Sequence, residues 1–229
     1  MNDYPVRISA ALDPHLSRWR WLVKSVLVIP HYVVLFALWA GFLGVSVVAF
    51  FAIVFTGHYP RRLFDYNLGV LRWTWRVHYY AYGALGTDRY PPFSLGEYPA
   101  YPARLDIPYP SRLSRGLVLV KWWLLALPHY LILSLLVGGG LWASRSGNDA
   151  WAASGLLGLL VGVAGISLLF RGRYPDSLYR LIMGVNRWSL RVTAYASLMT
   201  DAYPPFRLDQ GGAEPDNGFA AGHVVVAPA

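Results

Sequence analysis

Residues 4–35 read YPVRISAALDPHLSRWRWLVKSVLVIPHYVVL, and residues 101–133 repeat the pattern as YPARLDIPYPSRLSRGLVLVKWWLLALPHYLIL. Further on, YPRRLFDYNLGVLRWTWRV (59–77) returns as YPDSLYRLIMGVNRWSLRV (174–192), and TDRYPPFSL (87–95) returns as TDAYPPFRL (200–208). The recurring signals, in order, are Tyr-Pro-x-Arg, Leu-Ser-Arg, Pro-His-Tyr, Gly-Val-x-Arg-Trp-x-x-Arg-Val and Tyr-Pro-Pro-Phe. Because self-similarity on this scale indicates a duplicated structural unit, we expect two like repeats, 4–95 and 101–208.

Composition places the chain outside the ordinary soluble class. Hydrophobic residues make up 55% of its 229 residues and charged residues only 14%, against about a quarter in a typical soluble domain. A bilayer core of roughly 30 Å needs about 20 apolar residues per helix. The first apolar run, Leu22–Phe55, is too long for one ordinary span, so we expect two that break near Ala40 and Gly41. In the second repeat, SRSGND (144–149) interrupts the apolar sequence. The prediction is four membrane spans, at about 20–40, 42–56, 117–142 and 151–170.

Each repeat also carries segments unlike these spans. It opens with alternating apolar and polar residues bounded by Tyr-Pro, a pattern typical of a short strand or extended arm. Its third helix, about 61–84 or 176–198, has a narrow basic stripe and a broad aromatic face, which favours a helix lying in the membrane interface. A helix packed on a soluble domain and a short tilted span are the alternatives. Residues 209–229 hold few large apolar groups and are expected to form a disordered tail.

These elements predict an all-α integral membrane protein of two tandem repeats. Each repeat is expected to be a transmembrane helical hairpin with an amphipathic interfacial helix and a short extended or β arm. Of the 20 Lys and Arg residues, only Arg145 falls in a predicted hairpin tip. The positive-inside rule therefore places the arms and both termini on the cytoplasmic face of the membrane. Because each repeat has an even number of spans, both copies should insert in the same direction, related by an axis along the membrane normal.

The charge of the chain predicts its partners. A net charge of +8 beside apolar segments favours anionic lipid headgroups over nucleic acid. The basic stripes of the third helices carry Arg72, Arg76, Arg187 and Arg191. A guanidinium group binds phosphate oxygens in bidentate fashion, so we expect these arginines to bind lipid headgroups or an acidic membrane-protein partner.

Several other polar and aromatic residues are explained by structural roles. Lys24 and Lys121 lie one turn inside the predicted cytoplasmic edge, where snorkelling to the headgroups explains them. Asp88 and Asp201, each between Thr and a Tyr-Pro-Pro-Phe segment, are typical of turns or caps. Tryptophans at the predicted span ends are expected to form an anchoring belt; they include Trp19, Trp21, Trp73, Trp75, Trp122, Trp123, Trp151 and Trp188.

His31 and His129 are the most distinctive ionisable residues, because each follows a proline inside a predicted span. Ionisable groups at membrane depth are rare and often functional. Like-oriented repeats would place the two histidines at equal depth and facing each other, as a polar site for a proton relay, a ligand or a metal. The structural alternative is that they satisfy backbone groups freed by Pro30 and Pro128 or form hydrogen bonds between helices.

No catalytic constellation accompanies these histidines. The sequence has no Gly-rich phosphate loop, no His-Glu-x-x-His and no Gly-x-Ser-x-Gly. It has no cysteine, which excludes thiolate catalysis and Cys-ligated metal. We therefore expect no catalytic residue, no metal site and no cofactor.

At the repeated residues the chain resembles an uncharacterised bacterial membrane-protein family, domain of unknown function 4389. The likeness rests on YPVR…LSRW…LVK…IPHY…FFAIVFTGHYPRRLFD…GVLRWTWRV…TDRYPPFSL and covers nearly all of residues 4–95. The second copy, 101–208, follows more loosely: it gains one residue between Lys121 and Pro128 and loses two before Thr200. The resemblance implies a duplicated integral membrane protein and supplies no activity or functional residue.

The sequence therefore predicts a non-enzymatic accessory or scaffold protein of the inner membrane. It would bind anionic lipid or a membrane partner, including a second copy of itself, through a basic cytoplasmic face. The alternative is a small transporter or channel with a site between the repeats near His31 and His129.

Overall fold

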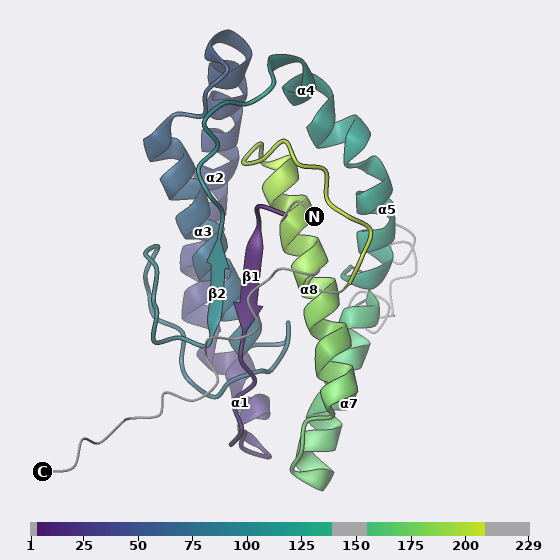
Figure 1. Cartoon of the computed structure of the whole chain (residues 1–229). Helices are drawn as coiled ribbons and strands as arrows, with labels where there is room; N and C mark the ends of the chain where they lie inside the picture. Colours follow the sequence, from purple (N-terminus) through teal and green to yellow (C-terminus); the bar gives the residue numbers. More distant parts are fainter. Residues whose placement is uncertain (1–3, 139–154, 209–229) are drawn as a thin grey trace, which may run out of the picture.

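A computed structural model describes residues 4–138 and 155–208 (Figure 1). These residues form helices and a single two-stranded sheet. In chain order the elements are β1 (Arg7–Ala10), α1 (Arg20–Leu27), α2 (Ile29–Thr56), α3 (Arg61–Tyr80), β2 (Ala103–Asp106), α4 (Arg115–Val120), the π-helical turn η1 (Lys121–Leu125), α5 (Leu127–Leu136), α7 (Gly155–Arg171) and α8 (Asp176–Ala196). The predicted tail (209–229), the interruption at 144–149 and Trp151 lie outside the described residues.

A pseudo-twofold axis relates the two repeats and passes through the sheet. β1 pairs antiparallel with β2, and Ile8 lies opposite Leu105. These two residues are also equivalent in the repeats, since each follows the arginine of Tyr-Pro-x-Arg. Equivalent residues that face each other in an antiparallel ladder lie on a twofold axis perpendicular to the strands. The predicted extended arms therefore form the centre of the molecule.

The long helices of the two repeats run in opposite directions, which corrects the prediction of like-oriented copies. In Figure 1, α2 rises from α1 to the top, whereas α5 and α7 descend from α4 to the bottom. The reason is that the first repeat contributes one long helix and not a hairpin, so the chain enters the second repeat from the opposite end.

The predicted break near Ala40 and Gly41 is wrong, because α2 continues through it for 28 residues. A glycine inside a helix costs only about 1 kcal/mol relative to alanine. Tyr66 of α3 packs against Gly41 and donates a hydrogen bond to the Leu38 carbonyl, 3.0 Å away. The helical run is interrupted instead at Val28, just before Pro30, where proline removes a backbone donor.

In the second repeat, α5 and α7 together take the place of α2. Gly155, at the start of α7, lies against the backbone of Leu136 and Val137, at the end of α5. The extra residue before Pro128 coincides with η1, and a π-helical turn absorbs one inserted residue. Within residues 4–138 and 155–208, two helices are long and apolar enough to cross a membrane, Ile29–Thr56 and Arg115–Leu136, while Gly155–Arg171 is apolar but shorter. Four spans are therefore not confirmed.

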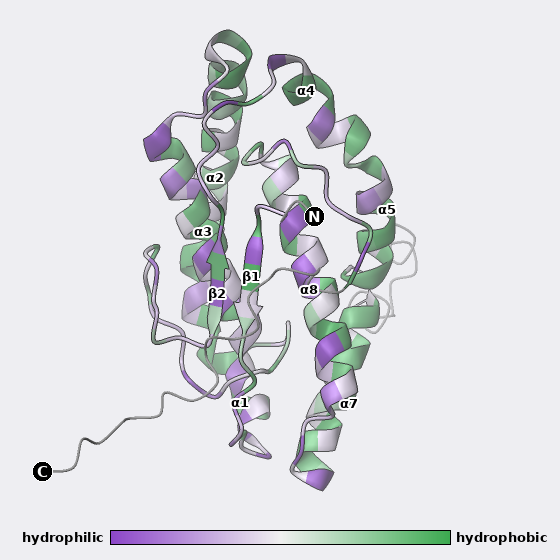
Figure 2. Ribbon diagram, in the orientation of Figure 1, coloured by the Kyte–Doolittle hydropathy of each residue, from purple (hydrophilic) through white to green (hydrophobic). Residues whose placement is uncertain are grey.

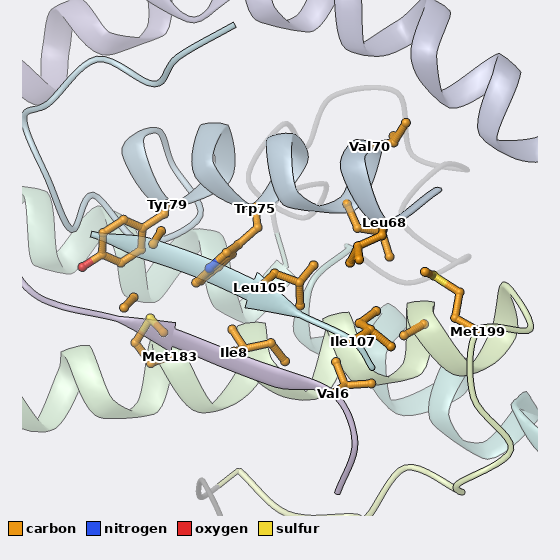
Figure 3. Packing of buried hydrophobic residues seen from close by; sticks show 14 of the residues in the cluster. Val6, Ile8, Leu68, Val70, Trp75, Tyr79, Leu105, Ile107, Met183 and Met199 are labelled. Carbon is orange, nitrogen blue, oxygen red and sulfur yellow. The ribbon is translucent and has the colours of Figure 1, made fainter. Parts of the chain in front are cut away.

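The third helices lie inside the protein. α3 packs against β2 on one side and α2 on the other, and α8 packs against η1, α5 and α7. Figure 3 shows Trp75 of α3 and Met183 of α8 meeting Ile8 and Leu105 of the strands. The aromatic face of α3, which the sequence places in the membrane interface, is thus buried in the core, as in the packed-helix alternative.

Candidate functional site

His31 lies in an aromatic enclosure at the start of α2. Its side chain is fully buried, and its Nδ1 accepts a hydrogen bond of 3.1 Å from the indole Nε1 of Trp73. The ring of Phe93 stacks on the imidazole with centroids 3.9 Å apart, and Tyr90 lies at 4.9 Å. Because Nδ1 accepts, the neutral imidazole carries its hydrogen on Nε2, which is buried and has no hydrogen-bond partner among the described residues.

The second repeat builds the same enclosure around His129. Trp188 Nε1 donates to His129 Nδ1 at 3.1 Å, Phe206 stacks at 4.1 Å and Tyr203 lies at 5.0 Å. Three repeated signals thus meet at each histidine: Pro-His-Tyr, Gly-Val-x-Arg-Trp and Tyr-Pro-Pro-Phe. The partners of each histidine come from its own repeat. The structure therefore places the two histidines in separate enclosures and does not join them into one site. Trp73 and Trp188 are packed inside the protein and do not belong to an outer anchoring belt.

A buried ion pair lies beside each enclosure. The Lys24 ammonium group is 3.0 Å from the Asp88 carboxylate and donates to the Thr87 carbonyl at 2.7 Å. The backbone N–H of Ser17 donates to the other Asp88 oxygen at 2.7 Å. Burial alone would raise the pKa of Asp88, but the Ser17 hydrogen bond and the neighbouring ammonium group outweigh it and lower that pKa. Lys24 therefore points inward and does not snorkel.

The second repeat contains the matching pair. Lys121 lies 2.8 Å from Asp201 and donates to the Thr200 carbonyl at 3.0 Å, while the Ser114 N–H donates to Asp201 at 2.6 Å. Sequence reasoning missed both pairs. The signal that could have found them is the joint recurrence of the Leu-Ser-Arg serine, the lysine and the Thr-Asp dipeptide in each copy.

The four stripe arginines make contacts within the chain. Arg72 donates to the Leu105 carbonyl at 2.9 Å and pairs with Asp106, and Arg187 donates to the Ile8 carbonyl at 3.4 Å. Each of these two arginines thus binds the strand of the other repeat.

Arg76 and Arg191 are more deeply placed. Arg76 donates to the carbonyls of Ser94 and Gly96 (2.8 Å to Gly96), around the end of the first repeat, and Arg191 lies over the Tyr4 ring at 5.6 Å. Only 2% of Arg76 and 0% of Arg191 is exposed. Headgroup binding by the four stripe arginines stays a prediction. For Arg76 and Arg191, which are buried, the geometry shows a structural role.

Exposed basic residues gather at the ends of the long helices. α2 ends at Gly57 (φ 76°) and α7 is followed by Gly172 (φ 65°), the left-handed conformation that glycine adopts freely. Arg115 lies beside Gly57, and Arg18, its equivalent in the first repeat, lies beside Gly172. A cation at the carboxyl end of a helix is favourable for the helix dipole. The Leu-Ser-Arg signal of each repeat thus covers the helix end of the other.

The outer faces of the long helices are apolar and exposed. Phe36 is 81% exposed on α2 and Phe170 is 78% exposed on α7. Figure 2 shows these helices as largely hydrophobic, while hydrophilic residues mark the strands, α3 and α8. Neither β1 nor β2 carries a large exposed apolar residue, and Arg7 and Asp106 are exposed there. Patches of this extent mark membrane or protein interaction surfaces.

The fold and site define a mostly helical, internally duplicated protein, whose described residues include two candidate membrane-crossing helices and two polar interior clusters. Among the described residues, no three His, Asp or Glu side chains are grouped as a metal site would need. The model of the family described as domain of unknown function (DUF4389) matches residues 18–94 and 150–207, so the chain belongs to that family with one matched segment in each repeat. Comparison with curated proteins and with solved structures gives no match.

Proposed function

We propose that this protein is a non-enzymatic accessory protein that lies in one leaflet of an anionic membrane. In this arrangement the long helices α2, α5 and α7 run in the plane of the bilayer with their outer faces among the acyl chains. The strand pair faces the water, where it is free to meet a partner. The observation that carries the proposal is the separation of exposed apolar residues on the outer helices from exposed charges on the strands.

The position of the pseudo-twofold axis supports this orientation over a spanning one. The axis passes through the strands, midway between the two ends of the long helices. In a spanning orientation the axis would lie in the membrane plane, and Arg7 and Asp106 would sit at the bilayer centre. A charged side chain there costs about 2.5–3.5 kcal/mol on insertion scales. With the axis along the membrane normal, both charges stay in water.

The basic helix ends support the same choice. Arg61 and Arg62 follow the end of α2, and Arg171 and Arg173 flank the end of α7. An in-plane molecule holds both clusters at one headgroup level, where each basic residue near an anionic surface contributes about 1 kcal/mol. We assign this surface to the cytoplasmic leaflet of a bacterial plasma membrane, with both termini in the cytoplasm. The transporter alternative lacks comparable support, because each histidine is enclosed within its own repeat.

Labelling of introduced cysteines with a membrane-impermeant reagent tests the orientation. Because the chain has no cysteine of its own, only the introduced thiol can react. R62C and R173C place single thiols at opposite ends of the long helices. In sealed vesicles that contain phosphatidylglycerol, both should react with a membrane-impermeant maleimide from the same side. Labelling from opposite sides would establish a spanning protein and refute the proposal. As internal controls, D106C should react readily and F36C should react only after the membrane is dissolved in detergent.

A further inference from the structure

An apolar groove opens in the outer layer between α2 and the η1–α5 segment. Its volume is about 680 Å³, within the range of about 300–1,000 Å³ typical of ligand sites. Val47 and Phe50 line one wall, Trp122 and Leu133 the other, and Ala196 of α8 belongs to the floor. Because the floor is an inner helix and the walls are outer helices, the groove opens on the apolar face. The inference below therefore rests on the proposed membrane orientation.

The few hydroxyl groups in the groove already have partners within the chain. Ser46 donates to the Phe42 carbonyl at 2.8 Å, Thr193 to Ser189 O at 2.9 Å and Ser197 to Thr193 O at 2.7 Å. A polar ligand would find little to bind in these walls. A hydrocarbon chain needs no such partner, and burying it gains about 0.8 kcal/mol per methylene group.

The other half of the molecule differs at the position that corresponds to Phe50. Gly165 of α7 is the repeat equivalent of Phe50, and the indole of Trp21 in α1 packs directly on it. Tyr82 holds Trp21 in place by donating a hydrogen bond to its carbonyl at 3.1 Å. In the open half, Trp122 belongs to η1, the π-helical turn that absorbs the extra residue of the second repeat. Such turns occur often at functional sites, and at these two positions the described residues of the two halves differ.

We propose that this groove holds one acyl chain of an anionic phospholipid, whose phosphate lies at the arginines beside the end of α2. The Nε atoms of Arg115 and Arg112 lie 3.4 and 3.7 Å from the position that a Cβ on Gly57 would occupy. Phe51 lines the groove six residues earlier in the chain, a rise of about 9 Å along the helix. The basic cluster and the apolar groove are thus close enough for the two parts of one lipid.

Native mass spectrometry of the full chain, titrated with palmitoyl-oleoyl phosphatidylglycerol in detergent, tests the proposal. V47W fills the groove from α2, and V48W is its matched control, because Val47 is 58% exposed and lines the groove whereas Val48 is 56% exposed and does not. Wild type and V48W should retain one phosphatidylglycerol, and V47W should bind it at least tenfold more weakly. L43W, also on an exposed groove residue, should repeat the V47W result.

A second matched pair of variants tests where the lipid headgroup binds. R115A should weaken retention of phosphatidylglycerol by about tenfold, while R18A, the equivalent change beside the end of α7, should leave it unchanged. Equal retention by V47W and V48W would overturn the acyl-chain assignment, as would retention of a free fatty acid in place of the phospholipid. Equal loss in R115A and R18A would overturn the placement of the headgroup.

Failure of this inference is separable from failure of the proposed function. In flotation with phosphatidylglycerol vesicles, V47W should float as wild type does, because the whole apolar face holds the protein in the membrane. If the cysteine labels instead show a spanning protein while V47W still loses its lipid, the orientation is wrong and the groove assignment stands.

Discussion

The two repeats share their interior and differ in their outer layer. Both copies enclose a histidine between Trp and Phe rings, and both bury a lysine against an aspartate. Outside, α2 is continuous, whereas its counterpart is divided into α5 and α7. The comparison teaches that the repeated signals specify how the chain folds back on itself. Under the proposed acyl-chain assignment, ligand specificity resides at positions where the copies diverge, such as Trp122 and Phe50.

Substitutions in the buried ion pairs test whether the two repeats have equivalent interiors, and they should have the largest effects on stability. D88N removes the counter-charge of Lys24 and should lower the free energy of unfolding by about 3–5 kcal/mol, the usual cost of leaving a buried charge unpaired. D201N should cost less, because the Asp201 side chain is 28% exposed against 10% for Asp88, so water can replace part of the lost interaction. Denaturant unfolding in detergent micelles measures both.

The exposed Arg61–Asp65 pair serves as the control for these variants. Its side chains are largely exposed, so D65N should change stability by less than about 1 kcal/mol. If D88N were no worse than D65N, the buried pair would not be a stabilising element of the first repeat.

Some of this architecture can be predicted from the sequence because it depends on local pattern. Alternation and Tyr-Pro dipeptides predict the arms, and Pro30 and Pro128 account for the breaks before the long helices. The direction of the second repeat could not be predicted, because a run as apolar as Leu22–Phe55 suits a hairpin and a single long helix equally. Its interpretation depends on contacts such as Tyr66 with Leu38, which only the folded chain brings together.

The candidate sites show the same limit. The sequence indicates that His31 and His129 are unusual, yet their partners lie some 40 to 80 residues away in the chain. Lysine near a predicted membrane edge is ordinarily explained by snorkelling, so the pairing of Lys24 with Asp88 required knowledge of the tertiary fold. Periodicity alone assigns the aromatic face of α3 equally well to lipid and to a protein core.

The histidine enclosures test whether the two interiors are energetically alike. W73F and W188F each remove an indole donor while keeping an aromatic ring, and each leaves a buried imidazole Nδ1 without its partner. We expect each to lower the free energy of unfolding by about 1–3 kcal/mol, by amounts that agree within about 0.5 kcal/mol. W123F, which removes an exposed indole bonded to its own helix, is the matched control and should have little effect. A large difference between W73F and W188F would show that the copies have diverged inside as well as outside.

The acid response of Asp88 sharpens the account of the first repeat and is the smallest expected effect. The pKa of Asp88 is lower in the folded protein than its ordinary value of about 3.9. A carboxylate of this kind adds stability that is fully present above the unfolded pKa and is lost as pH falls through the folded pKa, at about 1.4 kcal/mol for each unit of difference. The stability gap between wild type and D88N should therefore narrow as pH falls below about 4. Thermal unfolding of both proteins in one detergent across this range measures the gap. A gap that stayed unchanged as pH fell below 4 would mean that a group other than Asp88 controls the acid response of the first repeat.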